Sequence, residues 1–479
     1  MTSKIIKFIF NNEIHEIQNQ DSNETILNYI RLKLKKTGTK EGCAEGGCGA
    51  CTIVLGELDK NNIIYKAINS CIAFVPSLEG KQLIIVEDLV SKNKSLHPVQ
   101  DAMVNYHGSQ CGFCTPGFVM SLFAMYKNHS SYNKQVIQES VSGNLCRCTG
   151  YRPIIDAAKS LNKRNKYDQF EKNKKKIIRL LKKIKQRRIV IENNNKKYFA
   201  PKTINELKKI IKKYPNSKLL SGGTDVSLIV TKEKKEIENI IYLNSVNELD
   251  YIKKNKTYID IGATTSLRKF EFFIKKYYLD FNTILKRYGS VQIRNVATIA
   301  GNIATASPIG DTLPLLLSLD SKIVIQSLNR KKILPLNSFF ISYRKTKLKK
   351  GEFISSIRIP IFKKNIFKAY KISKRIDDDI SSVCASFNIE LVNKKIKNIK
   401  IAYGGMAPIP KRAFNCEKIL LNSNLSEEIF IKAKKNLEKD FNPIDDMRAG
   451  KRYRMEVAKN LLMKCFLEIK NNKLIRLTN

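Results

Sequence analysis

Eight of the eleven cysteines fall within the first 148 residues of this 479-residue chain, and they form two spaced sets. The first set follows the pattern C-x4-C-x2-C with a fourth, more distant cysteine, and consists of Cys43, Cys48, Cys51 and Cys71. The second combines C-x2-C with C-x-C, and consists of Cys111, Cys114, Cys146 and Cys148. Clustered cysteines in an intracellular chain indicate metal or redox chemistry rather than disulfides.

The spacing of the first set is the one that holds a 2Fe-2S cluster in plant-type sites. Glycines surround its ligands, and glycine allows the backbone to wrap closely and point N–H groups at the sulfurs. Zinc is the alternative, but zinc sites usually combine two short hairpins rather than one glycine-packed loop. The first set therefore favours a 2Fe-2S cluster. The spacing of the second set is compatible with both zinc and iron–sulfur chemistry.

Two glycine turns lie further along the chain, at residues 221–224 and 300–302. The first follows a strand-like segment, and such a turn can present successive N–H groups to a diphosphate. Taken alone it is a weak signal, because Gly-Gly turns usually only reverse the chain. No G-x-G-x-x-G motif is present, which argues against a Rossmann domain.

The periodicity predicts the elements that position these residues. Strands are expected at 6–10, 52–55, 63–68 and 83–86, with a turn at Asn11-Asn12 and a helix from about 24 to 35. From about 88 to 161 the period is helical, with Val99, Met103 and Tyr106 on one face and Pro98 and Pro153 in first turns. After 197 short helices and strands alternate, and strands at 385–391 and 399–403 precede the last helices.

The formal net charge is +44, with 68 Lys against 19 Arg. A lysine-rich excess spread along the chain is typical of a solvated surface, since arginine is the better residue for phosphate and base recognition. The charge-dense segment 162–196 carries an apolar stripe at Ile177, Leu180, Leu181 and Ile184, which predicts a linker helix packed on its own protein. The isolated Cys384, Cys416 and Cys465 are expected to be small buried hydrophobic residues. No signal peptide or membrane span is recognised, so a cytoplasmic location is expected.

Three segments identify a family. Residues 110–117 (QCGFCTPG) and 143–153 (GNLCRCTGYRP) resemble the second iron–sulfur domain of the molybdenum hydroxylases, and 45–52 (EGGCGACT) resembles their ferredoxin domain. The segments at 373–380, 404–407 and 446–449 most resemble the small subunit of bacterial xanthine dehydrogenases. The resemblance implies that the second cysteine set holds a second 2Fe-2S cluster, near a molybdenum cofactor on a partner subunit, whose pterin Gln110 would contact.

The resemblance also implies FAD contacts. Two stretches would wrap the diphosphate: Leu219, Leu220, Ser221, Gly222, Gly223, Thr224, Asp225 and Val226, and Thr298, Ile299, Ala300, Gly301 and Asn302. Asp311 would bind a cofactor hydroxyl, Tyr288 would lie against the flavin ring, and Ile354 and Lys371 would be further contacts. Ala300 replaces a family glycine, which would cost roughly 1 kcal/mol if φ were positive there. Tyr288 replaces a common Phe, so its hydroxyl needs a partner.

The expected fold is multidomain α+β. It comprises a β-grasp 2Fe-2S ferredoxin domain (1–87), a helical 2Fe-2S domain (88–161), a basic linker (162–196), a two-subdomain, non-Rossmann FAD-binding domain (197–365) and a C-terminal α+β domain (366–479).

By the same resemblance, the chain would carry electrons from a molybdenum-binding large subunit, in a heterotetramer, through two clusters to FAD and then NAD. Xanthine or hypoxanthine would be oxidised on the partner, so no catalytic residue is assigned here. Two alternatives stay open: the same chain of cofactors serving an aldehyde or another N-heterocycle, and a zinc-containing nucleic-acid-binding protein. Specific nucleic-acid binding is not expected.

Overall fold

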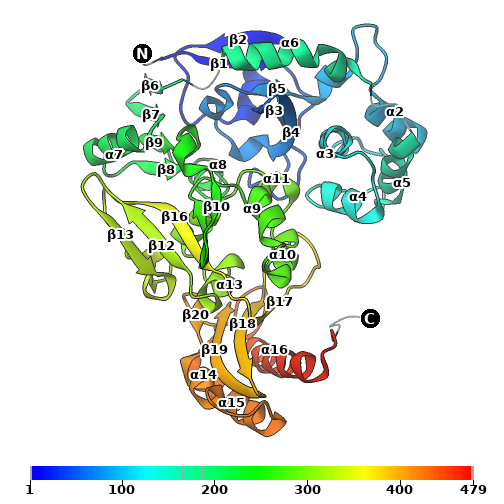
Figure 1. The fold of residues 1–479 in the computed structure, drawn as a ribbon. Coiled ribbons are helices and arrows are strands. Elements are labelled where there is room, and N and C mark those ends of the chain that lie inside the picture. Colours follow the sequence, from blue (N-terminus) through cyan, green and yellow to red (C-terminus); the bar gives the residue numbers. More distant parts are fainter. Residues whose placement is uncertain (1–2, 164–166, 185–186, 476–479) are drawn as a thin grey trace. The chain divides into compact units, whose positions relative to one another are not determined.

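The structure is a computed structural model that describes residues 3–163, 167–184 and 187–475. The chain divides into two compact units. The first contains Met1–Asn247 together with Gly289–Ala297, and the second contains Glu248–Tyr288 together with Thr298–Asn479 (Figure 1). Residues 164–166 and 185–186 of the expected linker lie outside the described residues.

The first unit begins with a five-stranded mixed sheet in the order β2-β1-β5-β3-β4. Its strands are β1 (Ile6–Phe10), β2 (Glu13–Ile17), β3 (Thr52–Asp59), β4 (Asn62–Asn69) and β5 (Gln82–Ile84). The β1–β5 pair is parallel and the other pairs are antiparallel, which matches the predicted ferredoxin-type sheet. Asn11 and Asn12 both have positive φ, as the predicted turn requires.

The helix expected near residues 24–35 is shorter and partly of another type. Thr25 caps α1 (Ile26–Asn28), and the chain then continues as the π-helix η1 (Tyr29–Lys33). The four helices of the next domain are α2 (Pro98–Asn105), α3 (Thr115–Asn128), α4 (Lys134–Val141) and α5 (Arg152–Ser160). Pro98 and Pro153 lie in first turns as predicted. The prediction for Tyr106 was wrong, because α2 ends at Asn105 and Tyr106 is exposed while Val99 and Met103 are buried.

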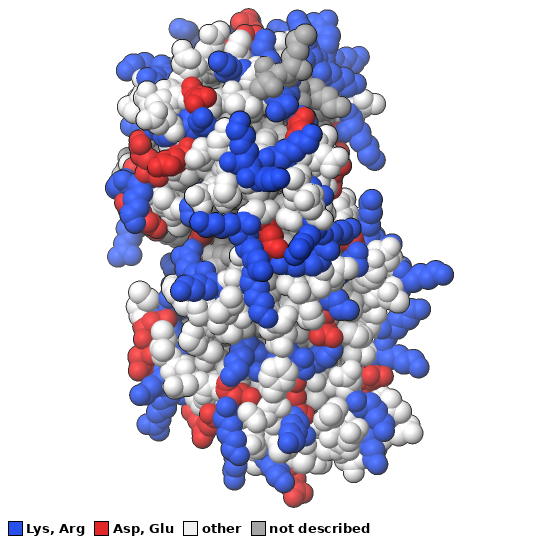
Figure 2. Space-filling model, turned by 90° about the vertical axis from the view of Figure 1, so that its left-hand side faces the viewer, with Lys and Arg blue, Asp and Glu red and all other residues white. Residues whose placement is uncertain are grey.

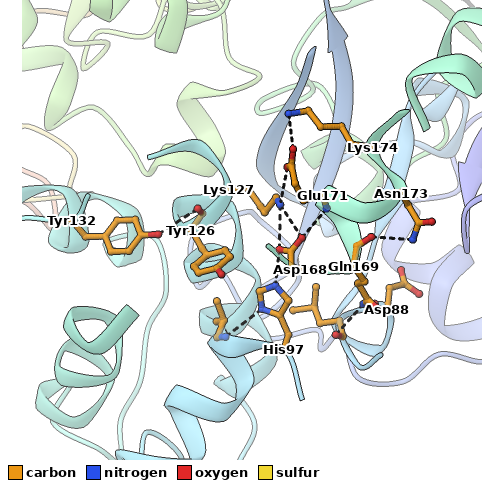
Figure 3. Close-up of polar contacts among 12 residues, drawn as sticks. Asp88, His97, Tyr126, Lys127, Tyr132, Asp168, Gln169, Glu171, Asn173 and Lys174 are labelled. Carbon is orange, nitrogen blue, oxygen red and sulfur yellow. Dashed lines mark hydrogen bonds and ion pairs between the residues drawn. The ribbon is translucent and has the colours of Figure 1, made fainter. Parts of the chain in front are cut away.

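The basic segment forms α6 (Gln169–Lys183), whose buried Phe170, Ile177 and Leu181 join the core of the first sheet and the helical domain. This confirms that the segment packs its apolar stripe on its own protein. Asp168 caps the helix by accepting from the Glu171 N–H at 2.8 Å. The same carboxylate lies between His97 Nε2 at 3.1 Å and Lys127 Nζ at 3.0 Å, which ties α6 to α2 and α3 (Figure 3).

The other face of the first sheet packs on a second, four-stranded sheet in the order β6-β7-β9-β8. Its strands are β6 (Ile189–Asn193), β7 (Lys196–Ala200), β8 (Lys218–Leu220) and β9 (Asn239–Tyr242). The helices α7 (Ile204–Lys213) and α8 (Leu228–Thr231) belong to the same part, and α11 (Val291–Arg294) returns to this unit from later in the chain.

The second unit contains two larger sheets. The first has the order β10-β11-β16-β12-β13, and its strands are β10 (Ile252–Lys254), β11 (Tyr258–Gly262), β12 (Lys322–Gln326), β13 (Lys331–Pro335) and β16 (Phe353–Pro360). The short hairpin β14 (Phe340–Ser342) and β15 (Lys345–Thr346) stands apart from it. The helices of this part are α9 (Leu267–Ile274), α10 (Leu279–Lys286), α12 (Ile299–Thr305) and α13 (Thr312–Ser318).

The last part is an antiparallel sheet in the order β17-β18-β19-β20, covered by three helices. The strands are β17 (Asn365–Ile372), β18 (Val383–Val392), β19 (Lys395–Gly404) and β20 (Lys411–Arg412), and the helices are α14 (Phe414–Leu420), α15 (Glu427–Asp440) and α16 (Lys451–Asn471). Cys384, Cys416 and Cys465 are buried as predicted. Short 3₁₀ turns complete the chain: η2 (Ser70–Ile72), η3 (Val75–Leu78), η4 (Val86–Leu89), η5 (Leu161–Lys163), η6 (Leu243–Ser245), η7 (Asn247–Leu249) and η8 (Leu336–Ser338).

Lys and Arg side chains are scattered over the face shown in Figure 2, with uncharged and acidic side chains between them. This distribution agrees with the solvated surface expected from the sequence. In the described part of the chain, no helix has the length and apolar character needed to cross a bilayer.

Candidate iron–sulfur and flavin sites

The first cysteine set meets in and beside the glycine-rich loop that precedes β3. Cys51 and Cys71 are buried and their sulfurs lie 3.2 Å apart, whereas Cys43 and Cys48 are half-buried. The backbone N–H groups of Glu45, Gly47 and Cys48 donate to Cys43 Sγ at 3.3–3.4 Å. Donors aimed at a sulfur stabilise it as a thiolate, which is the form that binds iron.

Hydrogen bonds couple the titration of the four thiols of this set. Hydrogen bonds from Cys48 and Cys71 hold the pKa of Cys43 well below its usual range, and a hydrogen bond from Cys71 lowers the pKa of Cys51. Hydrogen bonding to their thiolate neighbours, together with burial, raises the pKa of Cys48 and Cys71. A 2Fe-2S cluster is held by four cysteine thiolates. Four mutually close sulfurs with preformed N–H donors therefore fit that group.

The second cysteine set also comes together, at the start of α3 and in the loop before α5. Cys111 and Cys148 are exposed and share a hydrogen bond, and the half-buried Cys114 and Cys146 share another. Burial and the hydrogen bond with Cys146 raise the pKa of Cys114 to about 12. Gln110 is exposed directly before this set. The second set thus also brings four cysteine sulfurs together, the number that a 2Fe-2S cluster requires.

Within the described residues, no three His, Cys, Asp or Glu side chains converge as a site for a single metal ion. Hydrogen bonds join the cysteines of the first set in a row, from Cys48 through Cys43 and Cys71 to Cys51.

The first glycine turn of the flavin segment, after β8, is tightly packed within the first unit. A Cβ on Gly222 would lie 2.1 Å from the Val296 carbonyl oxygen, and one on Gly223 would lie 2.7 Å from the Ile72 carbonyl oxygen. Gly223 also has a positive φ of +75°. Internal packing therefore demands both glycines, independently of any diphosphate. Ile72 directly follows Cys71 in η2, so this glycine turn contacts the 3₁₀ turn that carries the fourth cysteine of the first set.

The second glycine turn, in the second unit, is the start of α12. Thr298 caps the helix by accepting from the Gly301 N–H at 3.0 Å. Ala300 lies inside the helix and is not among the positive-φ residues, so the strain considered from the sequence does not arise. Gly301 is exposed, and only Thr298 Oγ1 would lie within 4 Å of a Cβ there, at 3.0 Å. The Tyr288 hydroxyl accepts from Asn302 Nδ2 at 3.0 Å, which is the partner it needed.

Asp311 and Lys371 form a buried ion pair, with Lys371 Nζ 2.7 Å from Asp311 Oδ2. Ser381 Oγ donates to the other carboxylate oxygen at 2.5 Å, and Lys371 Nζ also donates to the Arg287 carbonyl at 2.9 Å. Ile354 is buried in β16. The sequence marked Asp311 and Lys371 separately as cofactor contacts, and it had no local signal for their pairing or for Ser381.

Four family models match successive parts of the chain. They are described as a 2Fe-2S iron–sulfur cluster binding domain at residues 9–76, a [2Fe-2S] binding domain at 85–159, an FAD binding domain in molybdopterin dehydrogenase at 192–362, and a CO dehydrogenase flavoprotein C-terminal domain at 368–469.

Curated relatives are larger proteins. Xanthine dehydrogenase of Emericella nidulans is 33% identical over 91% of this chain and 36% of its own length. Xanthine dehydrogenase 1 of Arabidopsis thaliana is 30% identical over 94% of this chain and 38% of its own length. The chain thus spans little more than a third of these relatives.

Solved structures share the fold of somewhat more than half of this chain. Carbon monoxide dehydrogenase from Hydrogenophaga pseudoflava has a TM-score of 0.53 at 23% identity, covering 55% of this chain and 93% of that one. Quinoline 2-oxidoreductase from Pseudomonas putida 86 has a TM-score of 0.53 at 19% identity, covering 57% of this chain and 95% of that one.

Two 2Fe-2S-binding domains followed by an FAD-binding domain make this chain an iron–sulfur flavoprotein. The flavin domain matches the type found in molybdopterin dehydrogenase. The chain belongs to the molybdenum hydroxylase family, of which it represents the iron–sulfur and flavin part.

Proposed function

We propose that this chain takes electrons from a molybdenum centre on a partner subunit and passes them through its two iron–sulfur sites to FAD and then to NAD. One observation carries the proposal. Both cysteine sets lie in one compact unit, and the flavin-segment glycine turn contacts the Ile72 carbonyl beside the ligand Cys71. The protein groups that would hold successive carriers are therefore in contact.

The ligands follow from the two cysteine sets. Cys43, Cys48, Cys51 and Cys71 would hold one cluster, and Cys111, Cys114, Cys146 and Cys148 the other. The N–H groups around Cys43 would stabilise the additional negative charge of a reduced site. When bound, FAD supplies the ability to collect two single electrons and release a hydride. The flavin-binding residues proposed are those of 219–226 and 298–302, with Tyr288, Asp311, Ile354 and Lys371, and Gln110 would meet the pterin.

The curated relatives named xanthine dehydrogenase favour xanthine as the substrate oxidised on the partner. We also propose hypoxanthine as a substrate, a heterotetrameric assembly and a cytoplasmic location. A second candidate keeps the electron route but serves another molybdenum hydroxylase reaction. It is favoured by the likeness in fold of part of this chain to a quinoline 2-oxidoreductase and a carbon monoxide dehydrogenase. The zinc-containing nucleic-acid-binding alternative has no support from the family models, which match 2Fe-2S domains at both cysteine sets.

The purified chain tests this proposal without its partner. It should contain about four iron atoms, as two 2Fe-2S sites require, with one FAD and no stoichiometric zinc. Anaerobic NADH should bleach the flavin and then the clusters, because the transfer to NAD is reversible in principle. A chain that holds iron and FAD but stays oxidised under NADH would refute NAD as the acceptor. Two zinc atoms per chain would refute the cluster assignment.

Gly301→Val tests the flavin site itself. The new side chain would project from an exposed position where only Thr298 Oγ1 lies within 4 Å of the Cβ. Valine is no worse than glycine in a helix, so α12 should persist. We expect loss of FAD and of NADH oxidation, with both clusters retained, and a weaker effect for the matched Gly301→Ala variant. Full flavin content in Gly301→Val would place the diphosphate elsewhere. Gly223→Val is a poorer probe, because it would also press on Ile72 beside Cys71.

A further inference from the structure

A short segment that follows Tyr288 in the chain packs against both cysteine loops. It contains α11, and its Ile293 packs with Cys51, Cys71 and Ile72 in a small apolar cluster. On the other side, a Cβ on Gly143 would lie 2.3 Å from Ser290 Cβ. The segment lies within the FAD-binding family match, yet it belongs to the compact unit that carries both cysteine sets.

Gln292 is the polar centre of this contact, and only 1% of it is exposed. Its Nε2 lies 3.1 Å from Asn144 Oδ1, 3.1 Å from Ser121 Oγ and 3.3 Å from Thr52 Oγ1. These three acceptors come from the loop before Cys146, from α3 and from the start of β3. A single side chain therefore joins both cluster-binding domains.

Asn144 continues the network to the first cysteine loop. Its Nδ2 donates to the Gly49 carbonyl at 3.0 Å and to Thr52 Oγ1 at 3.3 Å, and its Oδ1 accepts from Ser121 Oγ at 2.6 Å. Asn144 and Ser121 are 2% exposed, so these bonds form away from water. A buried polar network specifies one arrangement through the hydrogen bonds that its members make. Here the amide N–H groups of Gln292 and Asn144 have acceptors, whereas Gln292 Oε1 is buried without a hydrogen-bond partner in the described part of the chain.

The arrangement it specifies is a close backbone approach of the two cysteine loops. A Cβ on Gly49 would lie 2.1 Å from the Gly143 carbonyl oxygen, and one on Gly117 would lie 2.3 Å from the Gly49 carbonyl oxygen. At the same place the Leu145 N–H donates to the Cys48 carbonyl at 2.9 Å. Because Leu145 directly precedes Cys146, this one hydrogen bond connects a residue of the first cysteine set to the second set.

We propose that Gln292, Asn144 and Ser121 are positioning residues for electron transfer between the two iron–sulfur sites, and that the Leu145–Cys48 hydrogen bond is the connection they hold. The inference rests on the electron-transfer role proposed above. With clusters bound, one electron would leave the site of Cys146 and enter the site of Cys48; the first site would be oxidised and the second reduced, with no change in protons or covalent bonds. Apolar side chains could bind the domains together, but they would not hold this donor and acceptor in register.

Two mild variants test the network. Gln292→Met keeps the volume and removes the central donor, and Ser121→Ala removes one hydroxyl. The matched control is Asn128→Leu, at the far end of α3, where Asn128 hydrogen-bonds the Tyr65 backbone and so also joins the helical domain to the first sheet. The 14 residues of α3 place it ~20 Å along the helix from Cys114.

The readouts are taken on the full chain with both clusters loaded. They are the magnetic splitting between the two reduced clusters in paramagnetic resonance, and the rate at which one photo-injected electron equilibrates between them. Hydrogen exchange in a peptide containing residues 143–151 reports the Leu145 N–H independently of the clusters. We expect Gln292→Met to reduce the splitting, slow equilibration several-fold and speed exchange, with a smaller change in the same direction for Ser121→Ala.

Asn128→Leu should leave all three readouts at the wild-type values while it lowers the unfolding midpoint. Wild-type splitting and equilibration in both Gln292→Met and Ser121→Ala would overturn the inference. An equal change in Asn128→Leu would also overturn it, because the network would then only hold the two domains together. A wild-type chain without two cluster signals would instead refute the proposed function, and the inference with it.

Discussion

Replacing Asp168 by alanine removes the carboxylate that ties α6 to the helical iron–sulfur domain. Its side chain is 3% exposed and serves three groups: the N-terminus of α6, His97 and Lys127 (Figure 3). Loss of an N-cap costs about 0.5–2 kcal/mol, and leaving one partner of a buried ion pair alone costs about 3–5 kcal/mol. Lys127 keeps a second, longer contact with Glu171 at 3.7 Å, which reduces the second cost.

We therefore expect Asp168→Ala to lower the free energy of unfolding of this unit by about 3 kcal/mol, and its midpoint by roughly 6–12 °C at 2–4 °C per kcal/mol. Asp168→Asn retains an N-cap acceptor, so its free energy of unfolding should fall by about half as much as that of Asp168→Ala. The control is Asp156→Ala, on the surface of α5, where solvent screens the exposed pair with Lys159 and its loss should change stability little.

The pH dependence provides a second check. Burial alone would raise the pKa of Asp168, but the hydrogen bond from His97 and the charge of Lys127 lower it overall. A carboxyl group with a lowered pKa stabilises the fold above its unfolded pKa of about 4, and this contribution is lost as pH falls through the folded value. The difference in unfolding midpoint between wild type and Asp168→Ala should therefore shrink below pH 4. It is measured by thermal unfolding on samples of equal iron content. Equal midpoints for the Asp168 and Asp156 variants at pH 7 would refute the reasoning.

Three further predictions concern the cofactors and the surface. Cys48→Ser should abolish one of two iron–sulfur signals in paramagnetic resonance; loss of both would show that the two sites do not assemble independently. Lys371→Met leaves the buried carboxylate of Asp311 unpaired, so it should lower both the flavin-to-protein ratio and the thermal midpoint; wild-type flavin content would remove Lys371 from the flavin site. Binding to DNA should be weak and decline as salt rises, because dispersed lysines offer phosphate contacts only; tight, sequence-dependent binding at physiological salt would contradict this.

Local patterns were enough to predict most elements. Alternating and helical periodicities located the strands of the first sheet and the helices of the second domain, because the side of an element that is buried repeats along the chain itself. The proline positions at 98 and 153 marked helix starts for a local steric reason. Two details differ from the expectation: η1 replaces an α-helical continuation, and α2 ends before Tyr106.

The purpose of single residues was harder to predict. Gly222 and Gly223 suggested a diphosphate turn, yet their Cβ positions are closed by Val296 and Ile72, which are distant in sequence. Ala300 suggested strain that its helical backbone does not have. For the two glycines, the neighbours that explain the residue type come from other parts of the chain, whereas for Ala300 the local helix decides.

By itself, the sequence determined the two cysteine sets, the order of the domains and the family, because ligand spacing and motif are properties of consecutive residues. Only the tertiary structure decided which groups meet: Asp311 with Lys371, and Gln292 with Asn144 across 148 residues. Such contacts depend on how separate elements pack, and their polar side chains have no periodicity that marks them in advance. Burial increases the free energy lost when such a contact is broken, because a donor or acceptor shielded from water must find its partner within the protein.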